Sequence, residues 1–184
     1  MKKIFLGLLI LVSFYSNAQE SEFTFTAEKG MTDFIVTPIE GKTAPEIYKK
    51  VIEWIKVTYK NPDKVILSTL ENEYVRFEGS SDSFYAMNPI SKIYVPVKYQ
   101  IEISINDGKY KFDYIDMTII ENGTKIPYFS AKSKEELEPY PIFKKDGTLR
   151  STYKYFTEVP TYLNNLNKLL AESIVSTVKK SDGW

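Results

Sequence analysis

Strict alternation of apolar and polar residues predicts two paired strands in the middle of the chain. Between positions 93 and 106 every odd position is apolar and most even positions are polar, so one face packs in a core and the other contacts water. The turn Asn106-Asp107-Gly108-Lys109 follows, and Asp and Gly accept the backbone angles of a tight hairpin. The predicted partners across the turn are Ile105 with Tyr110, Ile103 with Phe112 and Ile101 with Tyr114. After Tyr114 the apolar positions shift by one, which predicts a β-bulge.

Further strands are predicted before this hairpin. Apolar-rich segments at 65–70 and 74–78 flank a polar tripeptide and indicate a second hairpin. The small and polar residues from Gly79 to Ser91 then predict a loop. Phe34-Ile35-Val36, ended by Pro38, predicts an earlier strand.

Two amphipathic helices complete the predicted elements. Thr43-Ala44-Pro45-Glu46 is a capping box with proline in the first turn, and Asn61-Pro62-Asp63 ends the helix that it begins. A second helix follows Pro160. The apolar positions are Ile47, Val51, Trp54 and Ile55 in the first helix, and Leu163, Leu166, Leu170, Ile174 and Val178 in the second. Their spacings of three and four place each set on one helix face.

Residues 121–160, before the last helix, are predicted to be an irregular insertion because Gly and Pro interrupt them repeatedly. Within this insertion Ser133–Leu137 is expected to form one helical turn. A short extra strand is expected at Tyr153, Tyr155 and Phe156. Residues 19–32 are expected to form an N-terminal segment or an edge strand.

The order strand, capped helix, four-strand meander and terminal helix resembles the β-α-β4-α arrangement of the TBP-like fold. The stretch from Asp33 to about Ile120 resembles a family of domains of unknown function with this fold, found in exported proteins of Bacteroidota. The residues behind the resemblance are Ala44-Pro45-Glu46-Ile47-Tyr48, Ile52-Glu53-Trp54-Ile55, Tyr59-Lys60-Asn61-Pro62, Tyr99-Gln100-Ile101-Glu102-Ile103 and Asp107-Gly108-Lys109-Tyr110-Lys111. The resemblance implies an α+β protein whose curved antiparallel sheet packs against the capped helix and the C-terminal helix. It implies no catalytic residues.

The first 18 residues have the parts of an export signal. Two lysines precede an apolar run, and the small Ser16 and Ala18 suit a peptidase that cleaves after Ala18. A membrane anchor is the alternative, but the run from Ile4 to Tyr15 is shorter than the roughly 20 residues that cross a bilayer. The chain has no cysteine for lipid attachment. We therefore expect an exported protein, periplasmic or extracellular, without a membrane span.

Length and charge limit the classes of partner. Of 184 residues, removal of residues 1–18 leaves 166, which suits one domain, predicted over 33–180 with a tail at 181–184. The chain has 24 basic and 24 acidic residues, and two of the lysines lie in the leader, so the mature formal charge is −2. Nucleic-acid binding usually needs a basic excess, so no nucleic-acid partner is expected.

The chain contains neither histidine nor cysteine. It therefore lacks the usual catalytic base, thiol nucleophile and metal ligands, and we expect no metal, no cofactor and no catalytic residue. An envelope enzyme that uses carboxylates or tyrosine remains the alternative, with the pairs Glu71 with Glu73 and Asp113 with Asp116 as its acids. The more ordinary interpretation is that these acids lie at hairpin tips and on sheet faces, where they keep the protein soluble.

Two sets of aromatic residues are candidates for binding. A hollow between sheet and helix would be lined by Trp54, Tyr99, Ile101, Phe112 and Tyr114, although large aromatics also simply fill a core. A contact surface rich in tyrosine is expected at Tyr94, Tyr153, Tyr155 and Phe156. The sequence thus favours a non-catalytic exported binding or interaction module, its partner an envelope protein, a glycan or an apolar small molecule. A structural subunit that self-associates through a sheet edge is a further alternative, and the oligomeric state stays open.

Overall fold

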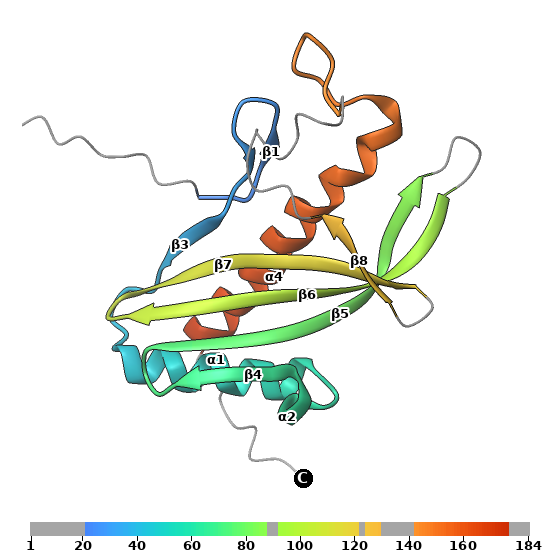
Figure 1. The fold of residues 1–184 in the computed structure, drawn as a ribbon. Coiled ribbons are helices and arrows are strands. Elements are labelled where there is room, and N and C mark those ends of the chain that lie inside the picture. Colours follow the sequence, from blue (N-terminus) through green and yellow to red (C-terminus); the bar gives the residue numbers. More distant parts are fainter. Residues whose placement is uncertain (1–20, 88–91, 122–123, 130–141, 177–184) are drawn as a thin grey trace, which may run out of the picture.

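The computed structural model describes residues 21–87, 92–121, 124–129 and 142–176, so the predicted leader and the predicted tail lie outside it. One antiparallel sheet, ordered β3-β7-β6-β5-β4, dominates the described part (Figure 1). Its strands are β3 (Phe34–Pro38), β4 (Ile66–Leu70), β5 (Tyr74–Met87), β6 (Lys92–Asn106) and β7 (Lys109–Glu121), with β8 (Thr124–Phe129) paired to the distal half of β7. A separate small hairpin joins β1 (Phe25–Thr26) to β2 (Gly30–Met31). Residues 19–32 thus supply, where described, a hairpin outside the main sheet.

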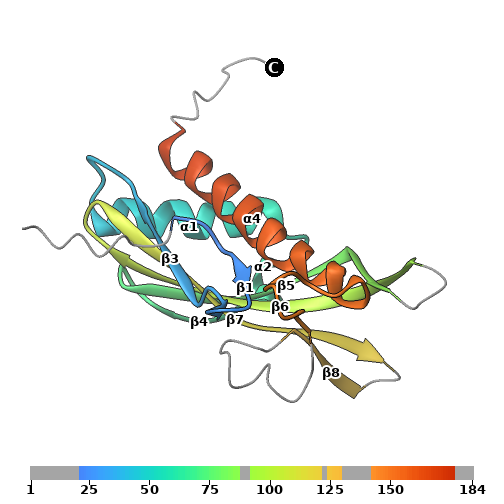
Figure 2. The same ribbon diagram turned by 90° about the horizontal axis from the view of Figure 1, so that it is seen from above.

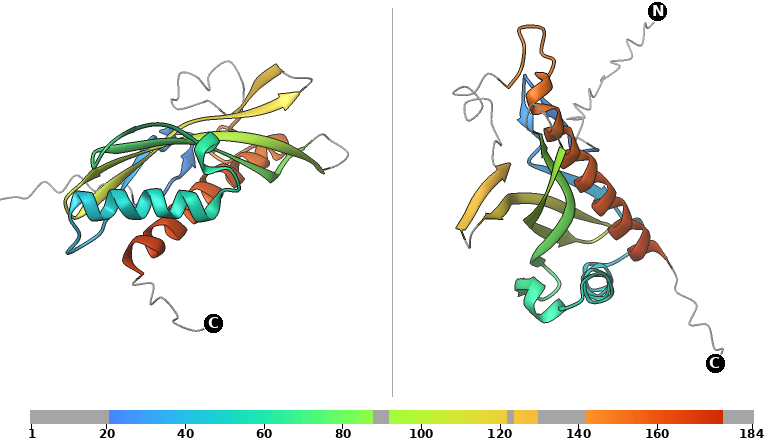
Figure 3. Two further views of the ribbon diagram at one scale, coloured as in Figure 1. Left: turned by 90° about the horizontal axis from the view of Figure 1, so that it is seen from below. Right: turned by 90° about the vertical axis from the view of Figure 1, so that its right-hand side faces the viewer.

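Both long helices pack against the same face of the sheet (Figures 2 and 3). The helical elements are α1 (Ala44–Thr58), the one-turn α2 (Pro62–Val65), the 3-10 helix η1 (Ser151–Thr157) and α4 (Glu158–Val175). The predicted N-terminus of α1 is confirmed, because the Glu46 carboxylate accepts hydrogen bonds from the Thr43 N–H at 2.9 Å and the Thr43 hydroxyl at 3.1 Å. The predicted apolar face of α1 is buried as well.

The register of the central hairpin is the predicted one. Ile105 faces Tyr110, Ile103 faces Phe112 and Ile101 faces Tyr114. The next pair is Gln100 with Asp116, so Ile115 is the extra residue of the predicted bulge. The bulge returns Met117 to the core, where it is fully buried.

The prediction of a loop from Gly79 to Ser91 is wrong for residues 79–87, which are the part of that range described in the structure. β5 continues to Met87 and pairs with β6 as far as Met87 with Lys92, apart from Asp82 and Ser83. Two features explain why the sequence did not indicate this strand. Gly79 and Ser81 stand where the alternation of Val75 and Phe77 would continue with apolar residues, and an irregularity between Ser81 and Phe84 breaks the alternation. Phe84 nevertheless lies in the core.

The C-terminal region also differs from the prediction. Tyr153, Tyr155 and Phe156 lie in η1 and not in a strand. α4 begins at Glu158, before Pro160, because a proline in the first helical turn lacks only an N–H that has no partner within the helix there. The helical turn predicted at Ser133–Leu137 lies outside the described residues, as does Val178 at the end of the predicted apolar stripe.

A buried amide fastens α4 to the sheet. The Tyr110 hydroxyl donates to Asn167 Oδ1 at 2.7 Å, and Asn167 Nδ2 donates to Thr37 Oγ1 at 3.0 Å. Asn167 thereby joins α4 to β7 and β3, and its polar atoms are satisfied inside the core. This attachment fixes the helix that borders the candidate site.

Candidate functional site

Three tyrosine hydroxyls meet where α1, β6 and α4 come together. Tyr59 follows the last turn of α1, Tyr99 lies on β6, and Tyr162 lies on α4. The Tyr59 and Tyr99 hydroxyls are 2.9 Å apart, and the Tyr162 hydroxyl donates to that of Tyr99 at 3.0 Å. We call these residues the tyrosine trio. The trio links both helices to the sheet through one shared oxygen.

Tyr99 can occupy the centre of the trio because its cross-strand partner is a glycine. Gly79 faces Tyr99 in the β5–β6 ladder. A methyl group at Gly79 would overlap the Tyr99 ring, so the ring occupies the space that any other side chain would fill. Tyr99 is only 1% exposed.

Burial raises the pKa of all three hydroxyls above the ordinary tyrosine value. The charges that would form on neighbouring hydroxyls raise the pKa of Tyr99 further. The trio therefore stays neutral near pH 7. It offers hydrogen bonds to a ligand and no base for proton abstraction.

A groove passes over the tyrosine trio. A central cleft of about 270 Å³ is bordered by Tyr59, Tyr99, Tyr162, Leu166 and Leu169. It shares Ser80 with a cleft of about 540 Å³ on one side, and shares Tyr162 with a cleft of about 460 Å³ on the other. Because neighbouring clefts share lining residues, we treat them as one feature, the tyrosine groove.

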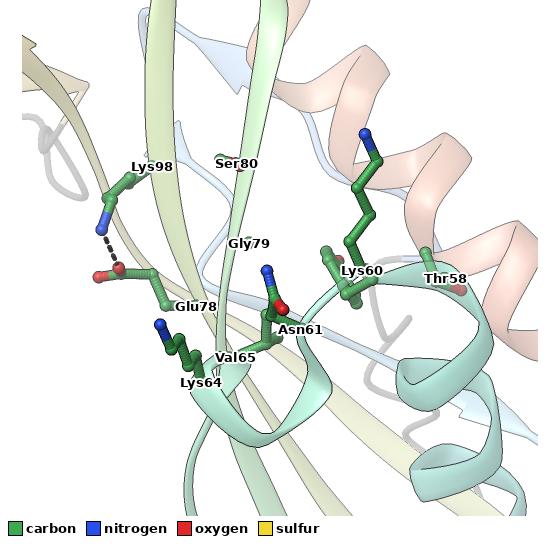
Figure 4. Close-up of a pocket in the computed structure, with 10 residues that line it drawn as sticks. Thr58, Lys60, Asn61, Lys64, Val65, Glu78, Gly79, Ser80 and Lys98 are labelled. Carbon is green, nitrogen blue, oxygen red and sulfur yellow. Dashed lines mark hydrogen bonds and ion pairs between the residues drawn. The ribbon is translucent and has the colours of Figure 1, made fainter.

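One end of the tyrosine groove is cationic. Lys60, Lys64 and Lys98 line the cleft of about 540 Å³ together with Asn61 and one acid, Glu78. Figure 4 shows Lys98 and Lys64 on either side of Glu78, while Lys60 points away from that carboxylate. Lys98 Nζ lies 2.7 Å from Glu78 Oε1. Within the described part of the chain, Lys60 and Lys64 form no ion pair.

The opposite end of the groove is lined mostly by hydroxyl and amide groups. Ser83, Thr157, Thr161 and Asn165 border this cleft, together with Phe84 and Glu158. The groove thus changes from cationic, through aromatic, to polar with one acid. A site with apolar walls and a few polar groups is typical of ligand binding.

The residues predicted to line a cleft separate into two groups. Tyr99 is almost completely buried and is one of the residues that border the central cleft. Trp54, Ile101, Phe112 and Tyr114 are buried in the core, and none of them lines the four clefts described among the placed residues. Two of them pack edge to face with other core rings, Trp54 with Phe77 at a centroid distance of 6.0 Å and Phe112 with Phe23 at 5.7 Å.

The residues predicted to form a contact surface lie on two elements. Tyr94 is on β6 and is 64% exposed. Tyr153, Tyr155 and Phe156 are half-buried on η1, where the Phe156 ring lies 5.8 Å from that of Tyr153 and 4.5 Å from that of Tyr155. Packing among themselves accounts for part of this aromatic density.

Sequence reasoning missed most of the groove. Gly79 and Ser80 fell in a predicted loop, and Tyr162 was not among the predicted site residues. The one available signal was Gly79, since a glycine inside a strand indicates close approach by another group. Recognising it required the correct length of β5.

The acids offer no metal site in the described part of the chain, where no group of three potential ligands gathers. Asp113 is paired instead with Lys111 at 3.0 Å. Among the described helices, none is long and apolar enough to cross a membrane.

Comparison with protein families confirms the resemblance inferred from the sequence. Residues 35–119 match the model of the family described as domain of unknown function (DUF4468) with TBP-like fold. The matched range lies within the predicted range from Asp33 to about Ile120. No curated protein matches this chain.

Two solved structures show the same fold. A DUF4468 family protein from Bacteroides ovatus is 13% identical, with a TM-score of 0.60, and the match covers 88% of this chain and 92% of that one. A TBP-like protein from Parabacteroides distasonis is 16% identical, with a TM-score of 0.51 and coverage of 77% and 90%. The protein therefore has a TBP-like α+β fold, as predicted.

Proposed function

We propose that this protein, whose residues 35–119 match a TBP-like domain of unknown function, is an exported binding module of the cell envelope without catalytic activity. The tyrosine groove is its binding site. Its occupant is a segment of an envelope protein, a glycan or an apolar small molecule. The formal charge of −2 after removal of the leader supports a partner other than nucleic acid.

The observation on which this function rests is the arrangement of the groove over the tyrosine trio. Neutral hydroxyls from Tyr59, Tyr99 and Tyr162 lie at its centre, and Leu166 and Leu169 form an apolar wall. Such a surface hydrogen-bonds and packs at once. The raised pKa values of the trio argue against tyrosine acting as a base.

Export is supported by the leader alone, so it needs its own test. The full chain should be expressed in its native host and the cells fractionated. We expect the mature protein in the envelope or medium, with a mass that corresponds to cleavage after Ala18. A full-length product that stays in the cytoplasm would contradict export.

Occupancy of the groove can be tested by native mass spectrometry of protein purified from its own envelope. We expect a retained molecule on the wild type and none on Ser80→Trp, which fills the junction of two clefts. Thr69→Trp is the matched control, because Thr69 is exposed on β4 away from the groove. A bare wild type, or equal retention by both variants, would contradict the proposed site.

A further inference from the structure

The outer edge of β5 is only partly covered. β4 pairs with β5 from Tyr74 to Phe77, whereas β6 pairs with the other edge of β5 as far as Met87. Among the strands of the described residues, none pairs with this outer edge beyond Phe77. A strand edge presents backbone N–H and C=O groups at every second residue, and an extended peptide can pair with them.

The cationic end of the tyrosine groove lies along this edge. Gly79 and Ser80 belong to β5 and also line the cleft of about 540 Å³. Gly79 presents no side chain, and Ser80 is small and exposed, so little obstructs a chain laid beside them. The irregularity between Ser81 and Phe84 limits regular pairing to a few residues.

The charge beside this edge selects the chemistry of the partner. Three lysines and one acid line the cleft, and the acid, Glu78, is already paired with Lys98. Lys60 and Lys64 have no carboxylate partner in the described part of the chain. Their ammonium groups complement carboxylates on a partner, which gives specificity as well as affinity.

We infer that the partner is an extended, acidic peptide segment of another protein, which adds as a short strand to β5 beside residues 79–81. Its backbone pairs with the strand edge, and its carboxylates contact Lys60 and Lys64. This inference rests on the proposed function and names the partner class for the cationic end of the groove. Glycans and apolar small molecules then become outcomes that contradict the inference and leave the proposed function standing.

Selection from a displayed library of random decapeptides tests the inference with mature wild-type protein. We expect enrichment of sequences with two or more acidic residues among β-formers, whose binding weakens as salt rises. Basic or uncharged consensus sequences, or no enrichment at all, would overturn the inference.

A selected peptide should then be measured against charge variants. We expect Lys60→Glu/Lys64→Glu to weaken binding about tenfold or more, because two attractions become repulsions. Lys49→Glu/Lys145→Glu has the same change of net charge on exposed residues outside the groove, and it should bind as the wild type does. Lys60→Gln/Lys64→Gln is the second variant if the reversal perturbs folding. Equal binding by the groove and control variants would refute the assignment.

Amide hydrogen exchange locates the bound peptide. We expect new protection at residues 79–81 on addition of the selected peptide, since pairing protects backbone N–H groups. Protection confined to another surface would refute strand addition. A glycan or apolar molecule retained in the native mass spectrum, with no acidic peptide selected, would refute only this inference. A groove that retains nothing and selects nothing would refute the proposed function as well.

Discussion

The ring of Tyr99 on β6 lies over Gly79 on β5, in the place that the side chain of any other residue would occupy. This contact positions the hydroxyl that Tyr59 and Tyr162 share. It also leaves Gly79 without a side chain that would narrow the groove. One cross-strand pair thus determines both the centre of the tyrosine trio and the shape of the cleft beside it.

Substitution of Gly79 by alanine should therefore destabilise the protein. The added methyl group overlaps the Tyr99 ring, and overpacking of this kind costs about 1–3 kcal/mol. Chemical denaturation of Gly79→Ala measures the loss, with Ser80→Ala as the exposed control, expected within about 0.5 kcal/mol of wild type. In a Tyr99→Leu background the cost of Gly79→Ala should shrink, because the two residues are in contact. An undiminished cost in that background would show that the ring is not the obstacle.

Removal of the shared hydroxyl should cost more than removal of an exposed one. Tyr99→Phe leaves the hydroxyls of Tyr59 and Tyr162 without their common partner, and an unsatisfied buried polar group costs about 1–3 kcal/mol. The control is Tyr94→Phe, because Tyr94 is largely exposed. The free energy of unfolding should fall for the first variant and stay near wild type for the second. Equal free energies of unfolding for the two variants would mean that the hydrogen bonds of the tyrosine trio do not stabilise the protein.

Loss of the buried amide of Asn167 should destabilise the protein about as much as loss of the Tyr99 hydroxyl. Asn167→Ala removes the acceptor for Tyr110 and the donor to Thr37, and we expect a loss of about 1–3 kcal/mol. Asn165→Ala, on an exposed position of the same helix, is the control. Thermal unfolding compares the two, and a larger loss for Asn165→Ala would contradict the attachment of α4 described above.

Stability should fall at alkaline pH. Burial raises the pKa values of Tyr59, Tyr99, Tyr110 and Tyr162 above the ordinary value of about 10. Above that pH the unfolded chain has lost tyrosine protons that the folded chain retains, so the free energy of unfolding decreases as pH rises, and the contribution is fully present below about pH 10. Denaturation series between about pH 8 and 11 measure the slope.

Replacement of Tyr99 by phenylalanine gives the control for this slope. The variant lacks the Tyr99 hydroxyl, and therefore one of the protons that the folded chain retains and the unfolded chain loses. Its stability should depend less steeply on pH above about 10. Phenolate absorbance recorded alongside should appear in an early phase from exposed tyrosines and a late phase that accompanies unfolding. A single early phase that includes every tyrosine would contradict the burial of the trio.

The elements predicted correctly from sequence are those with local signals. The capping box beginning at Thr43 defines α1 through contacts three residues apart, and the turn at Asp107-Gly108 sets the register of the central hairpin. The bulge at Ile115 was visible because it shifted the apolar alternation. In each case the residues that interact are neighbours in sequence or related by one turn.

The groove depends on contacts that local patterns do not encode. Tyr162 meets Tyr99 across a separation of 63 residues, and Gly79 meets Tyr99 only if β5 continues beyond Glu78. The serines of distal β5 masked that continuation. The predicted cleft residues Trp54, Ile101, Phe112 and Tyr114 share the sheet face or helix face of the core, but pattern alone does not distinguish a filled interior from a lined cleft.

Occupancy of the tyrosine groove is tested by amide hydrogen exchange on the protein as purified from its envelope, compared with the same protein after unfolding, removal of bound molecules and refolding. We expect protection at residues 59–65 and 78–81 in the first sample that is lost in the second, with unchanged exchange along β3 and β7. Identical exchange in both samples, or a difference that avoids the tyrosine groove, would contradict it.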